Sequence, residues 1–331
     1  MKISIVMTTY NGETYIEKQI ISLLEQSRKA DEIIICDDVS SDDTVNIIQN
    51  ILKKEKSSCC QLIINKENLG YKKNFKKAIE MASGDLIFLC DQDDIWEKDK
   101  LEKIEKIFEQ NPKVIALNSA FSLIDGEDCE IPYQCRKGFY NHDFIRGKAG
   151  ENELVHIEYG MLLRYNISPG CTMAFRKCIK PGYLKYTKSI LPHDWELNLL
   201  AGMQDGCYFL NTPLIKYRIH GKNTLGMNTN DHLSVFQFEK DIDFRVASIK
   251  EKLALISIME TWHKRYRIQD RQLKDFNKIK RFDLLREKAV CQHKITAWIQ
   301  LFFLTCILWD GKYVRFKSLL GDLFYVMRRD K

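Results

Sequence analysis

Residues 85–94 read Asp-Leu-Ile-Phe-Leu-Cys-Asp-Gln-Asp-Asp, an apolar run that passes directly into an acidic cluster. The run is short and has no polar residue at alternate positions, so it predicts a strand that is buried on both faces. The cluster Asp91 to Asp94 stands at the carboxyl end of this strand. Ligands of parallel α/β sheets bind beyond the carboxyl ends of the strands, and the stretch therefore predicts both a fold class and the location of a site.

The residues before this stretch repeat the same pattern. Apolar runs predict strands at 3–9, 32–36 and 62–64, and helical spacing predicts helices at 13–26, 44–54 and 72–82. Ser41-Asp42-Asp43 supplies capping chemistry for the second of these helices. Strands that alternate with helices predict an α/β fold with a mostly parallel central sheet covered on both faces. Thr8 to Asn11 and Asp37-Asp38 also end strands, so three polar groups should meet at one edge.

The pattern loosens after Pro112. Strands are expected at 114–120 and 214–219, a helix at 194–201, and helices from Leu233 to Lys331. The polar stretch 125–158 is long for a simple connection and predicts a substrate loop or a mobile flap.

Composition sets further bounds. The chain has 331 residues, 45% of them hydrophobic and 29% charged, and a formal net charge of +6, which does not call for a nucleic-acid partner. Its 11 cysteines form no Cys-x-x-Cys pair, and a strand is expected from Lys2, which leaves no room for a signal peptide. These features predict a reducing, cytoplasmic compartment.

Asp91-x-Asp93 suits a divalent cation, with Asp94 as a further candidate ligand. Mg²⁺ and Mn²⁺ prefer oxygen ligands, and on these carboxylates either ion would stabilise the diphosphate that leaves a nucleotide sugar. The alternative is a solvated turn or a helix N-cap before Ile95-Trp96. The spaced acidic ligands and the loop glycine of an EF-hand are missing.

Other residues fit the same chemistry. Asp37, Asp38 and Thr9 would bind base and ribose; their alternative role is helix capping, which Asp42 and Asp43 could equally provide. Neither Gly-x-Gly-x-x-Gly nor a Walker loop is present, which disfavours a dinucleotide dehydrogenase and excludes a P-loop enzyme. A carboxylate in the segment 193–196, at the start of a helix, would take the acceptor proton, or serve as an N-cap. His220 would complete a metal shell, or be an ordinary surface or core residue.

The ordered motifs resemble the inverting family 2 glycosyltransferases of the GT-A fold, over residues 1 to 225. Each motif is weak alone, but their order along the chain is specific. They are residues 6–12 (Val-Met-Thr-Thr-Tyr-Asn-Gly), 36–42 (Cys-Asp-Asp-Val-Ser-Ser-Asp), Asn68-Leu69-Gly70 with Asn74, Gly84-Asp85 leading into Asp91 to Asp94, 170–175 (Gly-Cys-Thr-Met-Ala-Phe), His193-Asp194-Trp195 and 217–223 (Tyr-Arg-Ile-His-Gly-Lys-Asn).

The resemblance implies residue roles. Asp194 would be the catalytic base. Asp91 and Asp93 would hold Mg²⁺ or Mn²⁺, with Asp93 as the direct ligand and His220 joining the shell. Val39 departs from the Gly or Asn usual before the serine, which shifts the turn but keeps both aspartates. The nucleotide would be bound by Thr9, Tyr10, Asn11, Asp37, Asp38, Asn68, Lys73, Asn74, Asp91 and Gln92. The acceptor would be bound by Trp96, Cys171, Thr172, His193 and Trp195.

The resemblance also implies an organisation and a donor. Residues 1–225 would form the GT-A domain, with a nucleotide-binding part at 1–112 and an acceptor-binding part at 113–225, and residues 226–331 a helical region. The motifs at 91–96, 170–175 and 193–195 look like the rhamnosyltransferase-like subgroup, which uses dTDP-L-rhamnose to build bacterial surface polysaccharides. A UDP-hexose donor remains the alternative.

The tail carries an apolar segment at 297–309 with flanking basic residues (Lys294, Lys312, Arg315, Lys317, Arg328 and Arg329). The segment is too short to span a bilayer. It fits a helix that lies on the cytoplasmic leaflet near a lipid-linked saccharide acceptor, and equally a helix that packs on the catalytic domain or on a second copy of the chain.

Two other functions compete. A sugar-nucleotide pyrophosphorylase would need a Gly-rich basic loop after the first strand, and residues 9–13 do not form one. A non-catalytic sugar- or lipid-carrier-binding subunit would not need both the acidic cluster and Asp194.

Overall fold

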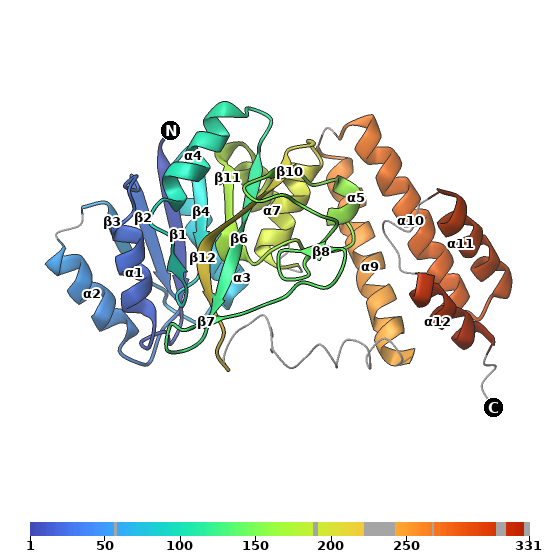
Figure 1. Ribbon diagram of the computed structural model, residues 1–331, viewed down its shortest axis with the longest axis horizontal. Coiled ribbons are helices and arrows are strands. Elements are labelled where there is room, and N and C mark those ends of the chain that lie inside the picture. The colour runs from blue at the N-terminus through green and yellow to red at the C-terminus, as the bar shows by residue number, and fades with distance from the viewer. Residues whose placement is uncertain (56–57, 188–190, 222–241, 267, 309–315, 328–331) are drawn as a thin grey trace. The chain divides into compact units, whose positions relative to one another are not determined.

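The fold is that of a computed structural model, which describes residues 1–331 except 56–57, 188–190, 222–241, 267, 309–315 and 328–331 (Figure 1). The chain divides into two compact units. The first comprises Met1–Glu158 and Asn166–Leu225, and the second comprises Tyr159–Tyr165 and Gly226–Lys331. The acidic stretch 85–94 and the other predicted site residues belong to the first unit.

The amino-terminal part of the first unit follows the predicted alternation of strands and helices, with only the ends of the elements shifted. Asp42 Oδ1 accepts the backbone N–H of Thr44 at 3.1 Å, but the residue at the N-cap position of α2 is Asp43, whose side chain makes no capping hydrogen bond. The helix begins where it was predicted to begin, without the predicted side-chain cap. The elements are β1 (Ile3–Thr9), α1 (Ile16–Leu24), β2 (Glu32–Asp37), α2 (Thr44–Lys54), β3 (Cys60–Ile64), α3 (Tyr71–Met81) and β4 (Leu86–Cys90).

The remainder of the first unit adds shorter strands and more helices. They are β5 (Ile95–Trp96), α4 (Lys100–Gln110), β6 (Ala116–Ile124), β7 (Glu130–Ile131), β8 (Phe139–Tyr140), β9 (Ile145–Arg146), β10 (Leu154–His156), β11 (Met173–Arg176), α6 (Lys180–Tyr186), α7 (His193–Gly202) and β12 (Cys207–Arg218).

All of these strands except β8 and β9 build one central sheet in the order β10-β12-β6-β11-β4-β1-β2-β3, with β5 on β12 and β7 on β6. β8 and β9 pair with each other in a separate two-stranded sheet. The pairs β4/β1, β1/β2, β2/β3 and β6/β12 are parallel, whereas β11 and β10 run against their neighbours. The sheet is therefore mostly parallel, as predicted. All residues of β1 and β4 are buried, because helices cover both faces.

Right-handed crossovers place α1 and α2 on one face of the sheet and α3 on the other. The packing agrees, since α1 contacts α2, whereas α3 contacts α6 and α7 (Figure 1). This arrangement leaves the carboxyl ends of β1, β2 and β4 side by side, where the predicted site residues begin.

Two differences from the sequence-based expectation have a physical cause. The last strand was expected only at 214–219, but β12 starts at Cys207. Its register on β6 shifts between Leu210 and Pro213 and again between Pro213 and Lys216, and such irregularities hide a strand from pattern analysis. The stretch 125–158, expected as a loop, contains β7 to β10. These strands are two or three residues long, so they carry little apolar patterning; β7 and β10 pair at the margins of the central sheet, and β8 and β9 pair only with each other.

The second unit is helical, as expected for the described residues after 241; the part of that prediction at 233–241 lies outside them. Its helices are α5 (Tyr159–Leu162), α9 (Ile242–His263), α10 (Asp270–Val290), α11 (Ile295–Leu308) and α12 (Phe316–Met327). Buried Asp322 accepts from Arg245 and Arg286, each at 2.7 Å. Among the helices described, none combines the length and the apolar character needed to cross a membrane.

Candidate functional site

Asp37 ends β2 and ties that strand to β1. Parallel pairing sets Thr9 opposite Asp37, and the Thr9 hydroxyl donates to Asp37 Oδ2 at 2.8 Å. Ser40 donates to the same carboxylate twice, from its backbone N–H (2.9 Å) and from its hydroxyl (2.5 Å). Because the carboxylate is fully buried, these bonds fix the turn between β2 and α2 against the end of β1.

Asp38 organises the next loop. Its carboxylate accepts from the backbone N–H groups of Leu69 and Gly70, each at 2.8 Å, and from the amide of Asn65 at 2.7 Å. The Asn68 amide donates to the carbonyl of Asp38 at 3.1 Å. Gly70 has a φ of 75°, a conformation that glycine adopts without strain. Asp38 and Asn68, both predicted to bind nucleotide, thus lie together beside the ends of β2 and β3.

Asn74 joins the same group from α3. Its amide donates to the Cys36 carbonyl at 2.9 Å, and its Oδ1 accepts from Asn65 at 2.9 Å. Lys73 is exposed. The lysine that reaches Asn65 is Lys77, at 2.6 Å. The nucleotide contact expected of Lys73 stays a prediction, and Lys77 is the cation that the sequence analysis missed.

Gln92 connects the acidic loop to β1. Its Oε1 accepts the Tyr10 N–H at 2.8 Å, and its Nε2 donates to the Tyr10 carbonyl at 3.1 Å. Gly12 leaves room for this amide, because a Cβ at that position would lie 2.4 Å from Gln92 Oε1. The Tyr10 ring is half exposed. The backbone of Tyr10 is therefore held in place while its ring stays accessible to a flat ligand.

Two residues with positive φ shape the adjoining turn. Asn11 (φ 48°) accepts the Ser41 N–H at 2.8 Å. Val39 has a φ of 66°, where a β-branched residue is strained by about 1–2 kcal/mol. Glycine and asparagine tolerate this conformation, which explains why the related motif favours them before the serine. Val39 keeps the turn and both neighbouring aspartates at that energetic cost.

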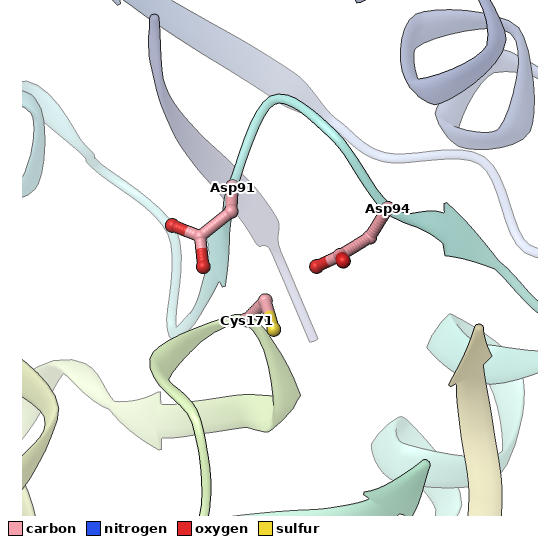
Figure 2. Close-up of side chains that lie close together, drawn as sticks. All are labelled: Asp91, Asp94 and Cys171. Atoms are coloured by element: carbon pink, nitrogen blue, oxygen red, sulfur yellow. The ribbon is translucent and has the colours of Figure 1, made fainter. Parts of the chain in front are cut away.

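The acidic loop after β4 points two carboxylates at one thiol. Asp91 and Asp94 face Cys171, which belongs to the turn Gly170–Thr172 (Figure 2). One ligand atom from each residue lies within 4.8 Å of the others. Burial raises the pKa of Asp91 well above its usual range, and the charges of Asp94, Asp93 and Asp194 raise it further. Burial and the charge of Asp93 likewise raise the pKa of Asp94 to about 7.

Asp93 turns instead toward the end of β12. Its Oδ2 lies 2.8 Å from His220 Nε2, and both side chains are partly exposed. Arg218, fully buried, donates its backbone N–H to Asp94 Oδ1 (3.1 Å) and its Nε to the Asp93 carbonyl (2.8 Å). Its guanidinium lies over the Tyr15 ring, 4.5 Å from the centroid. Arg218 therefore fastens the acidic loop to β12, a role that sequence analysis did not assign.

Lys100 was also missed. It is fully buried at the start of α4, donates to the Cys171 carbonyl at 2.8 Å, and lies 3.5 Å from the centre of the Trp96 ring. Burial lowers its pKa to about 7. The sequence offers one indication of this role, because Lys100 lies in the first turn of the helix that follows the acidic cluster. Lys100 places a titratable cation next to the carboxylates of Asp91 and Asp94.

The predicted base opens α7. Asp194 is buried and accepts from the Asn166 amide at 2.7 Å. Its charge contributes to the raised pKa of Asp91, so the base and the acidic loop lie within electrostatic range. Tyr71 starts α3, and its side chain is exposed in part. The burial of the rest of the side chain, followed by the charges of Asp194 and Asp91, raises the pKa of its hydroxyl. Tyr71 had no predicted role, although an aromatic directly after Asn68-Leu69-Gly70 would have pointed to it.

The residues predicted to bind acceptor are all buried. His193 stacks on Phe75 with ring centroids 3.9 Å apart, and neither of its ring nitrogens has a hydrogen-bond partner within the described part of the chain. Burial keeps its imidazole neutral by lowering the pKa to about 4. The others are Trp96, Cys171, Thr172 and Trp195. Their acceptor role stays a prediction.

The carboxylates suit a hard divalent cation, although the structure brings Asp91 and Asp94 together beside Cys171 and pairs Asp93 separately with His220. Asp91, Asp93 and Asp94 offer carboxylate oxygens and His220 a ring nitrogen, whereas the Cys171 sulfur is a soft ligand that Mg²⁺ and Mn²⁺ disfavour. The second oxygen of Asp94 is buried without an N–H or O–H donor among the described residues. Closely spaced carboxylates with raised pKa values gain most from a cation, since it removes their mutual repulsion.

Comparisons with known sequences point to a glycosyltransferase family. The sequence model described as glycosyl transferase family 2 matches residues 4–167, a range that ends before Asp194, Arg218 and His220. An uncharacterized glycosyltransferase of Haemophilus influenzae is 36% identical over 182 residues, which cover 54% of this chain and 72% of that protein. A dTDP-rhamnosyl transferase of Shigella flexneri, RfbG, is 27% identical over 241 residues, 67% of this chain and 74% of the relative.

Solved structures share the fold. S. aureus TarS (residues 1–349, in complex with UDP-GlcNAc) superposes with a TM-score of 0.56 at 16% identity, over 92% of this chain and 79% of that one. The mannosyltransferase PcManGT from Pyrobaculum calidifontis, in complex with GDP-Man and Mn²⁺, gives a TM-score of 0.53 at 14% identity, over 100% and 88% of the two chains. At such identities the likeness establishes the fold alone.

Proposed function

This chain belongs to glycosyl transferase family 2, and we propose that it transfers L-rhamnose from dTDP-L-rhamnose to a hydroxyl of a lipid-linked saccharide, with inversion at the anomeric carbon. One observation carries the proposal: the acidic loop after β4 is bonded to β1 through Gln92 and lies within electrostatic range of Asp194. In this proposal one site contains the groups that bind the nucleotide, stabilise the departing diphosphate and take up the proton of the acceptor.

The nucleotide is assigned to the ends of β1 and β2. The exposed ring of Tyr10 offers a stacking face for the base, and the buried aspartates Asp37 and Asp38 hold the loops on either side in place. Lys77 adds a positive charge beside Asn65 and Asn74. In this assignment the two aspartates act mainly by shaping the pocket, because nearly all of their oxygen lone pairs face donors of the protein itself.

A Mg²⁺ or Mn²⁺ ion held by Asp91 and Asp93, with His220 completing the protein ligands, would stabilise the charge that develops on the departing diphosphate. Arg218 supports this arrangement, because it holds the backbone of Asp93 and the side chain of Asp94 at the end of β12. PcManGT, which shares the fold, has been solved with Mn²⁺. Lys100, whose pKa is lowered to about 7 by burial, adds a titratable amine close by that is positively charged when protonated.

Proton transfer is assigned to Asp194. As the acceptor oxygen bonds to the anomeric carbon and the bond from that carbon to the diphosphate breaks, the acceptor proton moves to the Asp194 carboxylate. Asn166 orients this carboxylate through its 2.7 Å hydrogen bond. Tyr71, which is exposed and senses the charges of both Asp194 and Asp91, is assigned to contact with the transferred sugar or the acceptor.

Two observations bear on the donor. The motifs at 91–96, 170–175 and 193–195 and the similarity to RfbG favour dTDP-L-rhamnose. The complex of TarS with UDP-GlcNAc keeps a UDP-hexose donor as the second candidate. A lipid-linked acceptor would place the reaction at the inner face of the cell membrane, in the synthesis of a surface polysaccharide. A non-catalytic binding subunit or a homo-oligomer is left as an outcome for experiment.

A donor screen tests the proposal. Nucleotide release from dTDP-rhamnose, UDP-glucose and UDP-galactose should be measured with and without Mn²⁺, and dTDP-rhamnose should give the fastest metal-dependent turnover. Asp93→Asn should abolish the metal dependence, because an uncharged amide is a poorer ligand. Asp99→Asn, which removes a partly exposed charge just before α4, is the matched control and should behave as the unmodified protein. Absence of metal-dependent turnover with every donor would favour the binding-subunit alternative.

A further inference from the structure

Helix α11 is apolar on two faces. Its inner face buries Ala297, Leu301 and Leu304 against neighbouring helices of the second unit. Its outer face exposes Ile295 (43%), Ile299 (44%) and Phe303 (56%). These three residues are four positions apart, so they form one continuous stripe along the helix. Exposed apolar stripes of this kind mark an interaction surface.

Helix α10 carries a basic stripe next to this helix. A cavity of about 360 Å³ lies along it, lined by Asn277, Lys280, Arg281, Leu284, Leu285 and Lys288. These residues follow helical spacing, so three cationic side chains and two leucines line the same cavity along α10. Lys280 is paired with Glu260. Within the described residues, no acidic side chain is paired with Arg281 or Lys288.

Leu285 joins the two stripes. It lines the cavity on α10, and it also packs against a buried cluster that contains Ala289 and Ala297, beside Trp298 of α11. Trp298 and Phe302 stack with centroids 5.4 Å apart and are half buried. The basic groove and the aromatic part of α11 are therefore contiguous, and tryptophan in such a position suits a boundary between water and hydrocarbon.

Charge is distributed unevenly along the sequence. Residues 226–331 carry 21 Lys and Arg against 13 Asp and Glu, whereas residues 1–225 carry 30 against 32. The excess positive charge of the protein therefore lies in the helical region that also exposes the apolar stripe. A surface of apolar residues flanked by cations matches an anionic membrane, because the cations attract the headgroups and the apolar residues pack against the acyl chains beneath them.

We propose that α10 and α11 form a docking surface for an anionic membrane. Anionic lipid headgroups occupy the α10 groove at Arg281 and Lys288, and Ile295, Ile299 and Phe303 enter the outer edge of the hydrocarbon layer. The helix lies in the membrane plane, in keeping with its length of 14 residues. This surface concerns the second unit alone and does not depend on the proposed donor or acceptor.

Vesicle flotation of the full-length protein tests the surface, since it needs no sugar substrate. The protein should float with vesicles of equal parts phosphatidylcholine and phosphatidylglycerol, and not with phosphatidylcholine alone. Arg281→Gln with Lys288→Gln should weaken binding about 30-fold, at about five-fold per cation near an anionic surface. Ile299→Ser with Phe303→Ser should weaken it at least about ten-fold, through the lost apolar burial.

Matched variants of the first unit serve as controls. Lys53→Gln with Lys54→Gln removes two exposed cations of α2, and Ile21→Ser with Met81→Ser removes two partly exposed apolar side chains. Both controls should float as the unmodified protein does. Equal flotation of test and control variants, or equal binding to neutral vesicles, would overturn the proposal. So would a dimer in light scattering that Phe303→Ser converts to a monomer, because a second copy would then cover the stripe.

Discussion

Asp194→Asn separates proton removal from every other function of the site. The amide has the shape of the carboxylate, and its oxygen can still accept the 2.7 Å bond from Asn166, so the local structure should be retained. It cannot take up the acceptor proton. The side chain is buried, which limits the access of a water molecule that might replace it as base. We therefore expect kcat to fall by about 10²- to 10⁴-fold, the range for a lost general base.

The effect on donor binding should be small. Among the three carboxylates whose charges raise the pKa of Asp91, Asp194 contributes least. Its neutralisation should therefore change the affinity of the acidic loop for a metal-bound nucleotide by no more than about two-fold. Initial transfer rates at saturating donor, together with donor affinity from titration calorimetry, would measure the two effects separately.

Glu196→Gln is the matched control. Glu196 lies two residues further along the first turn of α7, is also buried, and accepts from the Thr187 hydroxyl. The charges that raise the pKa of Asp91 are those of Asp94, Asp93 and Asp194, and Glu196 is not one of them. The Gln variant should keep kcat within about three-fold of the unmodified enzyme. If Asp194→Asn kept more than a tenth of the activity, or if both variants lost activity equally, the assignment of the base would be refuted.

Three further perturbations follow from the structure. Burial raises the pKa of Glu196 to about 7 from 4.5, so the stability that its neutral form contributes is complete below 4.5 and is lost as pH rises through about 7. Glu196→Gln should flatten the fall in Tm across this window, and an unchanged slope would contradict the shift. Val39→Asn should raise the free energy of unfolding by about 1 kcal/mol in urea titrations, because it relieves strain at a φ of 66°; no gain would show that the turn is unstrained. Gly12→Ala would drive the Gln92 amide away from Tyr10 and should raise the donor KM about ten-fold with little change in Tm; an unaltered KM would remove Gln92 from the nucleotide site.

The parts of the site that could be predicted follow from one rule. Buried parallel strands appear as unbroken apolar runs, and polar residues at their carboxyl ends meet at one edge. Asp37 after β2 and Asp91 after β4 were located in this way, and the register that places Thr9 opposite Asp37 agrees with the prediction. Helix α2 was also placed correctly, because the polar run Ser41-Asp42-Asp43 marks its start, although no side chain caps it.

The remainder depends on contacts between residues that are distant in sequence. Lys100 and Arg218 are fully buried cations, whereas composition alone predicts that lysine and arginine stay exposed. Their positions depend on the Cys171 carbonyl and on the backbone of the acidic loop, and a single sequence does not reveal these partners. Likewise, the pattern could not show that Asp91 and Asp94 face Cys171 while Asp93 turns to His220, since neighbouring aspartates look alike in sequence.

The attachment of the acidic loop to β12 has a consequence for the order of folding. Arg218 and His220 lie 125 and 127 positions after Asp93, so during synthesis the loop is made long before the residues that hold it. The nascent chain can pair β1 with β2 and β4 early, yet the proposed ligands Asp93 and His220 come together only when β12 joins the sheet beside β6. Metal affinity should therefore be one of the last properties that the first unit acquires, and the onset of Mn²⁺ binding during refolding would report the docking of its final strand.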